Sequence, residues 1–464
     1  MRRHFLQGLI LLSLVLPTTA MAAEPVPPGK SHIEHVLYIE NHDIRLGVDL
    51  DLGGAITYLA PATNHALNVI NSFDWGRQVQ FSFYSGPVPY QPAGAKLSES
   101  WRFLGWNPIQ SGDCYGHPSK VIKYSRKGNL LYVKCVPMQW PLDNVPAESA
   151  GEVWLELDGP VVKARCRLSN HRADFTQYPA RTQELPAVYV NAPYHRLLTY
   201  RGDHPFTSDS MSQINNRLDK DGHWDSWPAT EHWAAQLDDH NWGLGIWNPT
   251  ALQFSGGFSS EPGIGGPTDA PTGYIAPNQN EILDHNIVFE YRYELILGTL
   301  SQIRAHVYQE PVETGLHWDF KNSRDSWSYV DAADTGWPIK DELNIQLTGR
   351  QPHILSPEFF HSAAQIKELR LQAAFLTGNT NATLFWRKLK QNEFPVNQFS
   401  QFHVIPDGKF RDYSIPLAAC PNFTGSIIQF RLDPQSKGIS NAEVKIKSIN
   451  SLRVKIKNPS SLPD

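Results

Sequence analysis

The chain has 464 residues and a net charge of only −5, from 41 basic and 46 acidic side chains. It carries no basic stripe, which argues against a nucleic-acid partner. Its length exceeds that of one typical domain, so we expect two or three domains. Fourteen Trp and seventeen Tyr are many for this length, and flat rings with one polar edge suit a partly wet surface.

The first 22 residues predict a secretory signal peptide. Arg2 and Arg3 precede an apolar run, Phe5–Leu16, that is too short to span a membrane. Residues 20–22, Ala-Met-Ala, have the small-x-small pattern of a cleavage site. We therefore expect the mature chain to begin near residue 23 and to be secreted or periplasmic, with no membrane span further along.

Four cysteines are compatible with an oxidising compartment but do not fix a disulfide pattern. Three pairings, partial pairing or no pairing are all open. Their spacing contains no CxxC or CxxH motif that would suggest a zinc site. Scattered Asp and His residues leave metal binding open, but no spacing supports it, and we expect no metal or cofactor. The four are Cys114, Cys135, Cys166 and Cys420.

Strand signals dominate the remaining sequence. Short alternating or β-branched runs are separated by Gly, Pro, Asn and Asp, and 32 Gly and 35 Pro fit many turns. Helical periodicity is weak, and its best candidate is Ser356–Gln365. The pattern predicts an all-β, mostly antiparallel protein. The expected strands include His35–Glu40, Ile44–Leu50, Leu130–Val136, Val153–Leu157, Val161–Leu168, Ala187–Asn191, Leu244–Trp247 and Ile287–Leu297.

The first site candidates surround a strand expected at residues 78–84. Its apolar positions should face the core, while the alternate positions carry amides, a hydroxyl and a phenol. Asp74, just before it, is a candidate catalytic acid, and a plain Asp74–Arg77 ion pair is the alternative. The candidate contacts for a polyhydroxylated ligand are Trp75, Arg77, Gln80 and Tyr84, and the expected core residues are Val79, Phe81 and Phe83.

A loop bounded by Gly and Pro gathers a second group of candidates. Asp113, Tyr115 and His117 lie close together in it, and clustered loop residues of these types often contact ligands. Asp113 is a candidate acid, and His117 can exchange a proton near neutral pH. A turn held by the side chain of Asp113 is the alternative.

Two glutamates are the leading candidates for catalysis. Glu184 precedes an apolar strand, where a half-buried carboxyl can have a shifted pKa. A structural pair with Arg181 is the alternative. Glu231 lies in a predicted hairpin with its turn at residues 238–241 and shares a face with Trp233. An acid beside an indole is a common sugar-site arrangement, and an ordinary edge-strand acid is the alternative.

The organisation of the chain predicts a boundary near residues 311–320. Residues 293–309 have the pattern of a closing strand pair, and a new aromatic-rich pattern follows. We expect domains at residues 30–312 and 318–458. The last strands, 444–448 and 453–456, alternate Lys with Val or Ile, as a charged edge strand does. The Gly- and Pro-rich segment at 256–273 predicts a long surface loop that overhangs the site.

Two stretches resemble known carbohydrate-active families. IRLGVDLDLGGAITYLAP, residues 44–61, is similar to the opening of galactose mutarotase-like domains. This implies an N-terminal antiparallel super-β-sandwich that holds sugar on a concave sheet. Asn170-His171 is followed by Arg-Ala-Asp rather than by the aromatic strand of that family, so a simple mutarotase is not expected. Residues 369–434 resemble the jelly-roll sandwich of carbohydrate-binding modules, which implies a C-terminal β-sandwich that supports the first domain or binds glycan.

These observations predict an exported carbohydrate-active protein. Our preferred chemistry is glycosidic bond cleavage by two carboxyl groups, about 5 Å apart for retention or about 6.5–9.5 Å apart for inversion. Glu184 and Glu231 form the first candidate pair, with Asp74 or Asp113 in reserve. The rings expected to line subsites are Trp75, Tyr84, Tyr115 and Trp233.

Two alternatives remain open at this stage. A non-catalytic periplasmic protein that binds or assembles glycans is the first. A polysaccharide lyase is the second, with Tyr115 or His117 as base and Arg77 to neutralise a uronate. The sequence names neither the sugar, nor the linkage, nor the oligomeric state.

Overall fold

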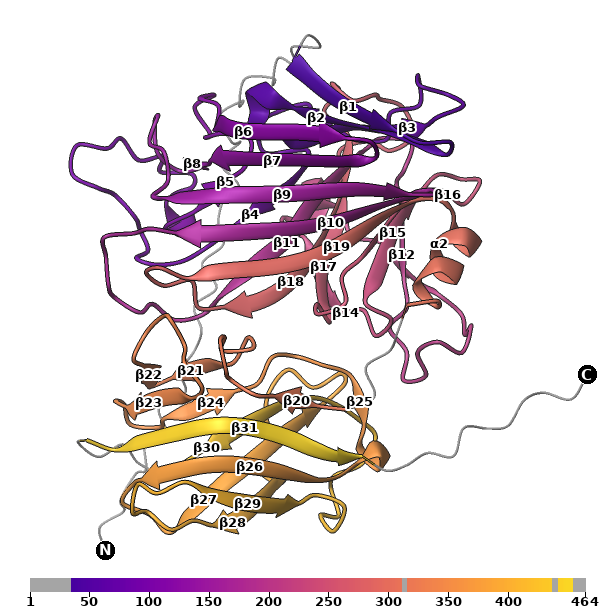
Figure 1. Ribbon diagram of the computed structural model, residues 1–464. Coiled ribbons are helices and arrows are strands. Elements are labelled where there is room, and N and C mark those ends of the chain that lie inside the picture. The colour runs from indigo at the N-terminus through magenta and orange to yellow at the C-terminus, as the bar shows by residue number, and fades with distance from the viewer. Residues whose placement is uncertain (1–34, 311–314, 436–440, 454–464) are drawn as a thin grey trace, which may run out of the picture.

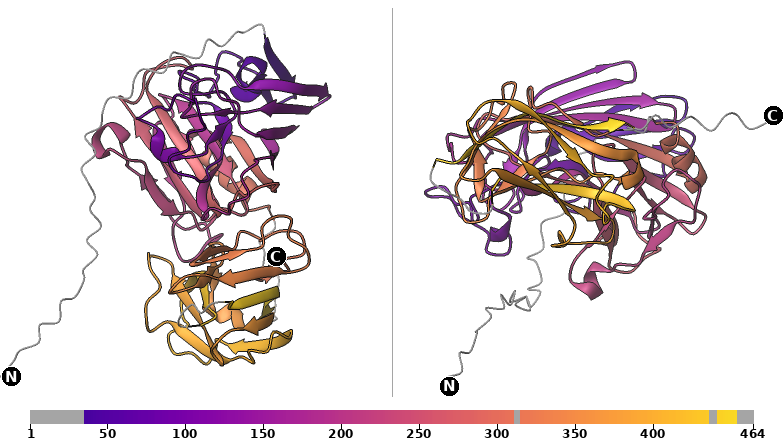
Figure 2. Two further views of the ribbon diagram at one scale, coloured as in Figure 1. Left: turned by 90° about the vertical axis from the view of Figure 1, so that its left-hand side faces the viewer. Right: turned by 90° about the horizontal axis from the view of Figure 1, so that it is seen from below.

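A computed structural model describes residues 35–310, 315–435 and 441–453 (Figure 1). The predicted signal peptide, part of the expected domain boundary and the strand residues 454–456 lie outside these ranges. The described chain is nearly all β, as the sequence predicted, and all pairings between its named strands are antiparallel. In Figure 1 and the left view of Figure 2, the sheets formed by residues 317–453 lie below those formed by residues 36–299.

The first sandwich consists of a ten-stranded and a nine-stranded sheet. The ten-stranded sheet runs β1 (Val36–Glu40), β2 (Ile44–Asp49), β3 (Ala55–Pro61), β4 (Val79–Ser82), β11 (Arg181–Asn191), β18 (Thr272–Glu281), β17 (Gln253–Ser259) and β14 (Asp225–Pro228), with β5 (Pro108–Ile109) and β8 (Met138–Gln139) beside β4. The nine-stranded sheet runs β13 (Ser212–Ile214), β12 (Arg196–Thr199), β15 (Trp233–Leu237), β16 (Trp242–Trp247), β19 (Val288–Thr299), β10 (Val161–Asn170), β9 (Ser149–Asp158), β7 (Leu130–Val136) and β6 (Lys120–Lys127).

A continuous apolar core lies between these two sheets. Val79, Phe81 and Phe83 are at most 1% exposed and belong to this core, as their alternation predicted. The ring of Phe83 meets those of Phe289 and Tyr291 from the opposite sheet edge-on, with centroids 6.2 and 6.3 Å apart. Full burial of each such side chain contributes about 1.5–3 kcal/mol. The polar alternate positions of β4 are thereby turned to the outer side of the ten-stranded sheet.

Two helices accompany the sandwich, α1 (Leu218–Asp221) and α2 (Leu300–Val307). The closing strand pair expected at 293–309 is wrong in its second half, because α2 replaces the strand. Thr299 caps the helix and forms a reciprocal capping box with Gln302. Ile303 and Val307 pack on the outer side of the nine-stranded sheet, in a cluster that includes Trp233.

The second sandwich has two six-stranded sheets around its own core. One runs β22 (Ala332–Asp334), β23 (Leu343–Leu347), β31 (Glu443–Arg453), β26 (Ile366–Leu376) and β29 (Arg411–Pro416), with β20 (His317–Trp318) beside β31. The other runs β21 (Ser328–Val330), β24 (His353–Leu355), β30 (Ser426–Asp433), β27 (Asn381–Lys388) and β28 (Phe399–His403), with β25 (His361–Ser362) beside β30.

Two expectations for this part of the chain are wrong. Residues 356–365 contain no α-helix; they hold β25 and a short 3-10 turn, Ala363–Gln365. The Lys-alternating strand β31 is central rather than an edge, since it pairs with both β23 and β26. The expected domain limits at 312 and 318 stay a prediction.

The two sandwiches are joined by a buried ion network. Arg324 is 3% exposed; its Nη2 lies 2.7 Å from Oδ2 of Asp284, and its Nε lies 2.5 Å from Oδ2 of Asp334. Burial lowers the pKa of Arg324, but the hydrogen bond and charge of Asp334 outweigh it and raise that pKa. Because Asp284 belongs to the first sandwich and Asp334 to the second, one guanidinium binds both.

All four cysteines are free thiols in this structure. Cys135 and Cys166 are buried, and burial raises the pKa of each thiol to about 12. Both therefore serve as small apolar core residues. Within the described ranges, no helix has the length and apolar character needed to cross a bilayer.

Candidate functional site

The outer face of the ten-stranded sheet brings Glu184 to its middle strands. Glu184 on β11 lies opposite Ser82 on β4 and Asn278 on β18. Directly opposed residues of an antiparallel ladder share a face. The register of β11 shifts after Glu184 on both sides, before Val188 against β18 and before Ala187 against β4, and such an irregularity re-aims a side chain.

Glu184 accepts hydrogen bonds from two tyrosines. The Oη of Tyr84 lies 2.9 Å from its Oε2, and the Oη of Tyr274 donates to its Oε1. Burial and then the charge of Glu184 raise the pKa of both phenols well above the usual value. Both phenols therefore stay protonated and donate to a carboxylate that is itself half-buried.

Aromatic rings surround this carboxylate. The rings of Tyr189 and Trp224 lie 4.8 and 4.9 Å from that of Tyr274, centroid to centroid. Tyr274 is 2% exposed, whereas Tyr189 and Trp224 are half-buried. A half-buried acceptor beside flat rings can bind hydroxyl groups and C–H faces of one ligand at the same time.

Asp74 and Arg77 form an ion pair beside this cluster. Nε of Arg77 lies 3.1 Å from Oδ2 of Asp74, and Nη1 of Arg77 donates to the carbonyl of Ala270. Burial raises the pKa of Asp74, although Arg77 opposes the shift. Burial and then Glu184 raise the pKa of Tyr189, and Asp74 adds to this, so both carboxyl groups act on one tyrosine.

The expected loop over the site is present between β17 and β18. The side chain of Asn71 donates to the carbonyl of Asp269 at 2.9 Å, and the backbone N–H of Ser72 donates to the carbonyl of Pro267 at 2.6 Å. The loop at residues 260–271 thus packs on the segment that carries Asp74. Residues 256–259 and 272–273, for which the sequence predicts a loop, are strand instead.

Gln80 and Trp75 hold the local structure together. Gln80 is 2% exposed; its Oε1 accepts from the backbone N–H of Ser111, and its Nε2 donates to the carbonyl of Trp75. A Cβ on Gly112 would come within 2.7 Å of the Trp75 ring, so only glycine fits there. Gln80 therefore fixes the neighbouring loop, and its burial keeps it from the exposed face.

Asp113 matches its alternative interpretation, a turn. It is 0% exposed and accepts from the backbone N–H groups of Tyr115, His117 and Asn144. The His117 imidazole lies 3.0 Å from its Oδ2. Tyr115 is half-buried, with the Lys96 ammonium 4.3 Å from its ring centroid. With its oxygens occupied and closed to solvent, Asp113 organises this loop.

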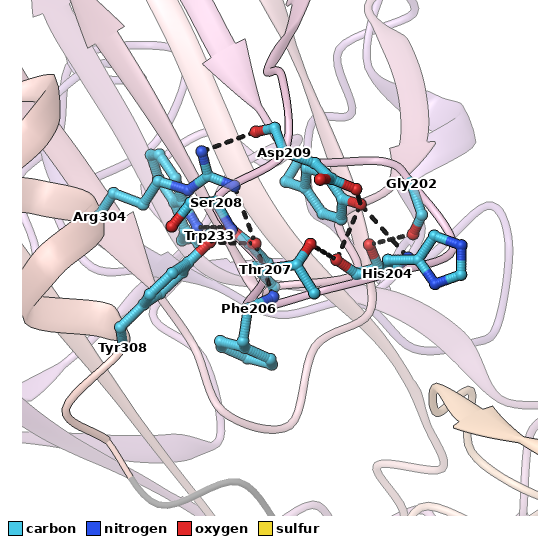
Figure 3. Close-up of polar contacts among 12 residues, drawn as sticks. Gly202, His204, Phe206, Thr207, Ser208, Asp209, Trp233, Arg304 and Tyr308 are labelled. Atoms are coloured by element: carbon cyan, nitrogen blue, oxygen red, sulfur yellow. Dashed lines mark hydrogen bonds and ion pairs between the residues drawn. The ribbon is translucent and has the colours of Figure 1, made fainter. Parts of the chain in front are cut away.

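Glu231 lies on the other sheet, just before β15, and is 0% exposed. Its Oε1 accepts from the backbone N–H of Phe206 at 2.9 Å, Nη2 of Arg304 at 3.2 Å and Oη of Tyr308 at 2.7 Å. Its Oε2 accepts from Nε1 of Trp233 at 3.0 Å. Figure 3 shows Arg304 and Tyr308 reaching from the helix side towards the loop that carries Phe206 and Asp209.

The structure does not bring Glu184 and Glu231 together. Glu184 lies on the outer face of the ten-stranded sheet, and Glu231 lies under α2 on the outer side of the nine-stranded sheet. Trp233 is 0% exposed, so its indole cannot line a surface subsite. The Arg181–Glu184 pair is also not formed, because Arg181 donates to the carbonyls of Ser85 and Leu104. The candidate site is therefore built on Glu184, with Tyr84, Asp74 and Arg77 nearby.

Sequence reasoning missed three aromatic members of this site. Tyr189, Tyr274 and Trp224 lie on three segments that are far apart in sequence. Tyr274, Ala276 and Asn278 alternate along β18, a period-2 signal that marks one face. Nothing in the sequence states that this face meets that of Glu184, because the pairing of β11 with β18 is non-local.

One group of side chains has the composition of a metal site. Glu294, His306 and Glu310 bring one potential ligand atom each within 4.8 Å of one another. The hydrogen bond from His306 Nε2 to Glu294, at 2.6 Å, raises the pKa of the imidazole. The contact between His306 and Glu294 accounts for the arrangement, and we assign no ion to it.

Solved structures that resemble the chain include sugar-related proteins. A galactose mutarotase-like protein from Lactobacillus casei ATCC 334 is 12% identical, with a TM-score of 0.37, over 56% of this chain and 99% of that one. Another from Clostridium acetobutylicum is 9% identical, with a TM-score of 0.36, over 57% and 95%. A low-affinity xylan-binding module from Roseburia intestinalis is 12% identical, with a TM-score of 0.21, over 30% and 96%.

Galactose mutarotase-like proteins are thus among the structures to which the chain is similar, as the sequence indicated. No protein-family model and no curated protein matches the sequence.

Proposed function

We propose that the protein is exported and binds a neutral glycan on the outer face of the ten-stranded sheet, around Glu184. The observation that carries this proposal is the arrangement of one half-buried carboxylate among Tyr84, Tyr274, Tyr189 and Trp224. The carboxylate accepts from sugar hydroxyls, and the exposed edges of the rings offer apolar contact to the C–H faces of a sugar.

The charges around Glu184 favour a neutral glycan over an acidic one. Glu184 and Asp74 contribute two carboxyl groups, and Arg77 is engaged by Asp74 and by the carbonyl of Ala270. A uronate would meet two carboxyl groups, and the second nearby guanidinium, that of Arg181, is held by the carbonyls of Ser85 and Leu104. The lyase alternative, which required Arg77 for a uronate, is therefore less well supported than binding of neutral sugar.

Binding is tested with neutral oligosaccharides and the variant Glu184→Gln. We expect titration calorimetry to give an affinity for wild type that falls at least about tenfold in the variant, or about 1.4 kcal/mol. The matched control is Glu99→Gln, because the side chain of Glu99 is 76% exposed and lies in a different segment. Equal affinity of wild type and Glu184→Gln, or no binding of any neutral glycan, contradicts the proposal.

Glycosidic bond cleavage is the second candidate function, and the raised pKa of Asp74 favours it. Burial raises the pKa of Asp74, and a general acid must hold its proton at working pH. Glu184 would then be the second carboxyl group, since both act on Tyr189. Release of reducing ends by wild type, lost in both Asp74→Asn and Glu184→Gln, supports cleavage. Glycan binding without release under any condition leaves binding as the function and removes this candidate.

A further inference from the structure

A pocket of about 560 Å³ lies beside α2, on the nine-stranded sheet rather than on the Glu184 face. Its walls come from the loop after β12, the β15–β16 turn and the first two turns of α2. This volume lies within the range of about 300–1,000 Å³ that is typical of small-ligand sites. The residues that line it include Ser208, Met211, Leu300, Ser301, Arg304 and Tyr308.

The lining contains one charged side chain, Arg304, and no carboxylate. Glu231 balances Arg304 from beneath, but Glu231 is 0% exposed and does not line the pocket. A second guanidinium, Arg196, donates to Oδ1 of the lining residue Asn241 at 2.8 Å. Arg196 forms no ion pair within the described part of the chain. Acids in the surrounding segments do not line the pocket: Asp209 accepts from Oη of Tyr200, and Asp238 from the backbone N–H groups of His240 and Trp242. The surface of the pocket itself therefore carries one guanidinium and no carboxylate.

Arg304 retains unused hydrogen-bonding capacity. Its Nη1 donates to the carbonyl of Asp209 at 2.7 Å and its Nη2 to Glu231 (Figure 3). Its Nε has no acceptor among the described residues, although the atom is buried. A buried N–H without an acceptor costs about 1–3 kcal/mol. A small rotation of the Arg304 side chain would let an anion in the pocket accept a hydrogen bond from this N–H and offset part of that cost.

The rest of the lining is amphipathic. Ser208 and Ser301 are exposed, and their hydroxyls have no partner among the residues that the structure describes. Met211 and Leu300 offer partly buried apolar surface on the same pocket. Hydroxyl groups beside apolar patches match the two kinds of surface on a sugar ring. We propose that this pocket binds a small hydroxylated anion, such as a sugar acid or a sugar phosphate, through Arg304.

The proposal is tested by placing a negative charge in the pocket without disturbing Glu231. Ser301 is exposed and lies in the first turn of α2, where an acidic residue stabilises a helix. Ser301→Asp should therefore fold at least as well as wild type while repelling an anion. Ser301→Asn is the neutral control of the same size. The probes are D-glucuronate, glucose 6-phosphate and uncharged glucose, each titrated by ligand-observed NMR up to about 10 mM.

We expect wild type and Ser301→Asn to bind at least one anionic probe, and Ser301→Asp to lose at least about tenfold in affinity for it. Binding of glucuronate alone identifies a carboxylate site, and binding of glucose 6-phosphate alone a phosphate site; either result supports the proposal. Three results overturn it: no anionic probe binds, glucose binds as well as the anions, or Ser301→Asp binds as wild type does.

This inference is independent of the proposed glycan site. Glu184→Gln should leave the affinity for the anionic probe unchanged, and Ser301→Asp should leave the affinity for neutral oligosaccharides unchanged. Loss of anion binding in Glu184→Gln would place the anion on the outer face of the ten-stranded sheet and overturn the assignment to the α2 pocket.

Discussion

Glu184 and Glu231 have similar sequence surroundings and very different structural ones. Glu184 lies within β11 and Glu231 just before β15, and each has aromatic neighbours in sequence or in space. Glu184 is half-buried and accepts from two neutral phenols. Glu231 is fully buried and accepts from four donors, one of them the guanidinium of Arg304. The first carboxylate keeps accessible acceptor capacity, and the second has none to offer a ligand.

The difference shows which property separates a binding carboxylate from a structural one. Proximity to an indole does not, because Glu231 bonds Trp233 and is still closed to ligand. The property that separates them is the number of hydrogen bonds that the carboxylate already accepts. The oxygens of Glu231 accept from the loop of Phe206, from the strand of Trp233 and from the side chains of Arg304 and Tyr308 at helix α2. Removing such a group should strongly destabilise the fold, whereas removing Glu184 should mainly affect binding.

The largest effect is expected at Glu231. Glu231→Gln removes the fully buried counter-charge of the partly buried Arg304 and should lower the free energy of unfolding by about 3–5 kcal/mol. Urea unfolding at pH 7 measures this loss. Glu261→Gln is the control, because the side chain of Glu261 is 85% exposed and its change should stay within about 0.5 kcal/mol. If Glu231→Gln lowered the free energy of unfolding by less than about 1 kcal/mol, Glu231 would not be the structural carboxylate that its hydrogen bonds indicate.

Glu281 sharpens the comparison, since it is buried without an ion pair in the described chain. It accepts hydrogen bonds from Ser326 and Gln279, and burial raises its pKa from 4.5 to about 7. Between about pH 4.5 and pH 7 the folded state holds a proton that the unfolded state has released. The free energy of unfolding therefore falls with rising pH across that range, by up to about 3 kcal/mol.

Glu281→Gln should remove this pH dependence and make the protein more stable than wild type at pH 8. Urea unfolding of both proteins at pH 4.5, 6 and 8 provides the measurement. Parallel pH profiles for wild type and variant would mean that Glu281 ionises with an ordinary pKa, and that its two neutral donors compensate for burial.

A matched pair of tyrosine variants gives the next effect. Tyr308→Phe removes one phenol donor from Glu231 and should cost about 1.5–3 kcal/mol, because a hydrogen bond to a buried charge is lost. Tyr84→Phe removes one from Glu184, where solvent can replace the donor, and should cost less than about 1 kcal/mol. Thermal unfolding compares the two directly, and equal losses would contradict the difference in accessibility.

The smallest expected change in stability is that of Glu184→Gln, below about 1 kcal/mol, because the amide keeps an acceptor for one of the two phenols. Its effect should lie in affinity for neutral glycan instead, as set out above. Denaturant midpoints measured on the same preparations separate the two quantities. A variant that loses both stability and binding would indicate that Glu184, like Glu231, is mainly structural.

The sequence by itself determined the β class and most of the strands of the first sandwich. Alternation placed Val79, Phe81 and Phe83 in the core, because side chains alternate between faces in any strand. It also predicted the β15–β16 hairpin, because that pairing is local; Glu231, expected to share a strand face with Trp233, instead lies in the turn before β15. The helix α2 was missed, although the Thr299–Gln302 capping box marked its start.

Only the tertiary structure decided which acids meet which partners. Glu184 and Tyr274 are separated by 90 residues, and the register that aligns β11 with β18 cannot be derived from either strand alone. The same holds for Glu231 and Arg304, 73 residues apart, and for β31, whose Lys residues suggested an edge although the strand is central. In an antiparallel protein the partners of a side chain are set by non-local pairing. The sequence therefore indicates on which face of a strand a residue lies, and the fold decides which side chains it meets there.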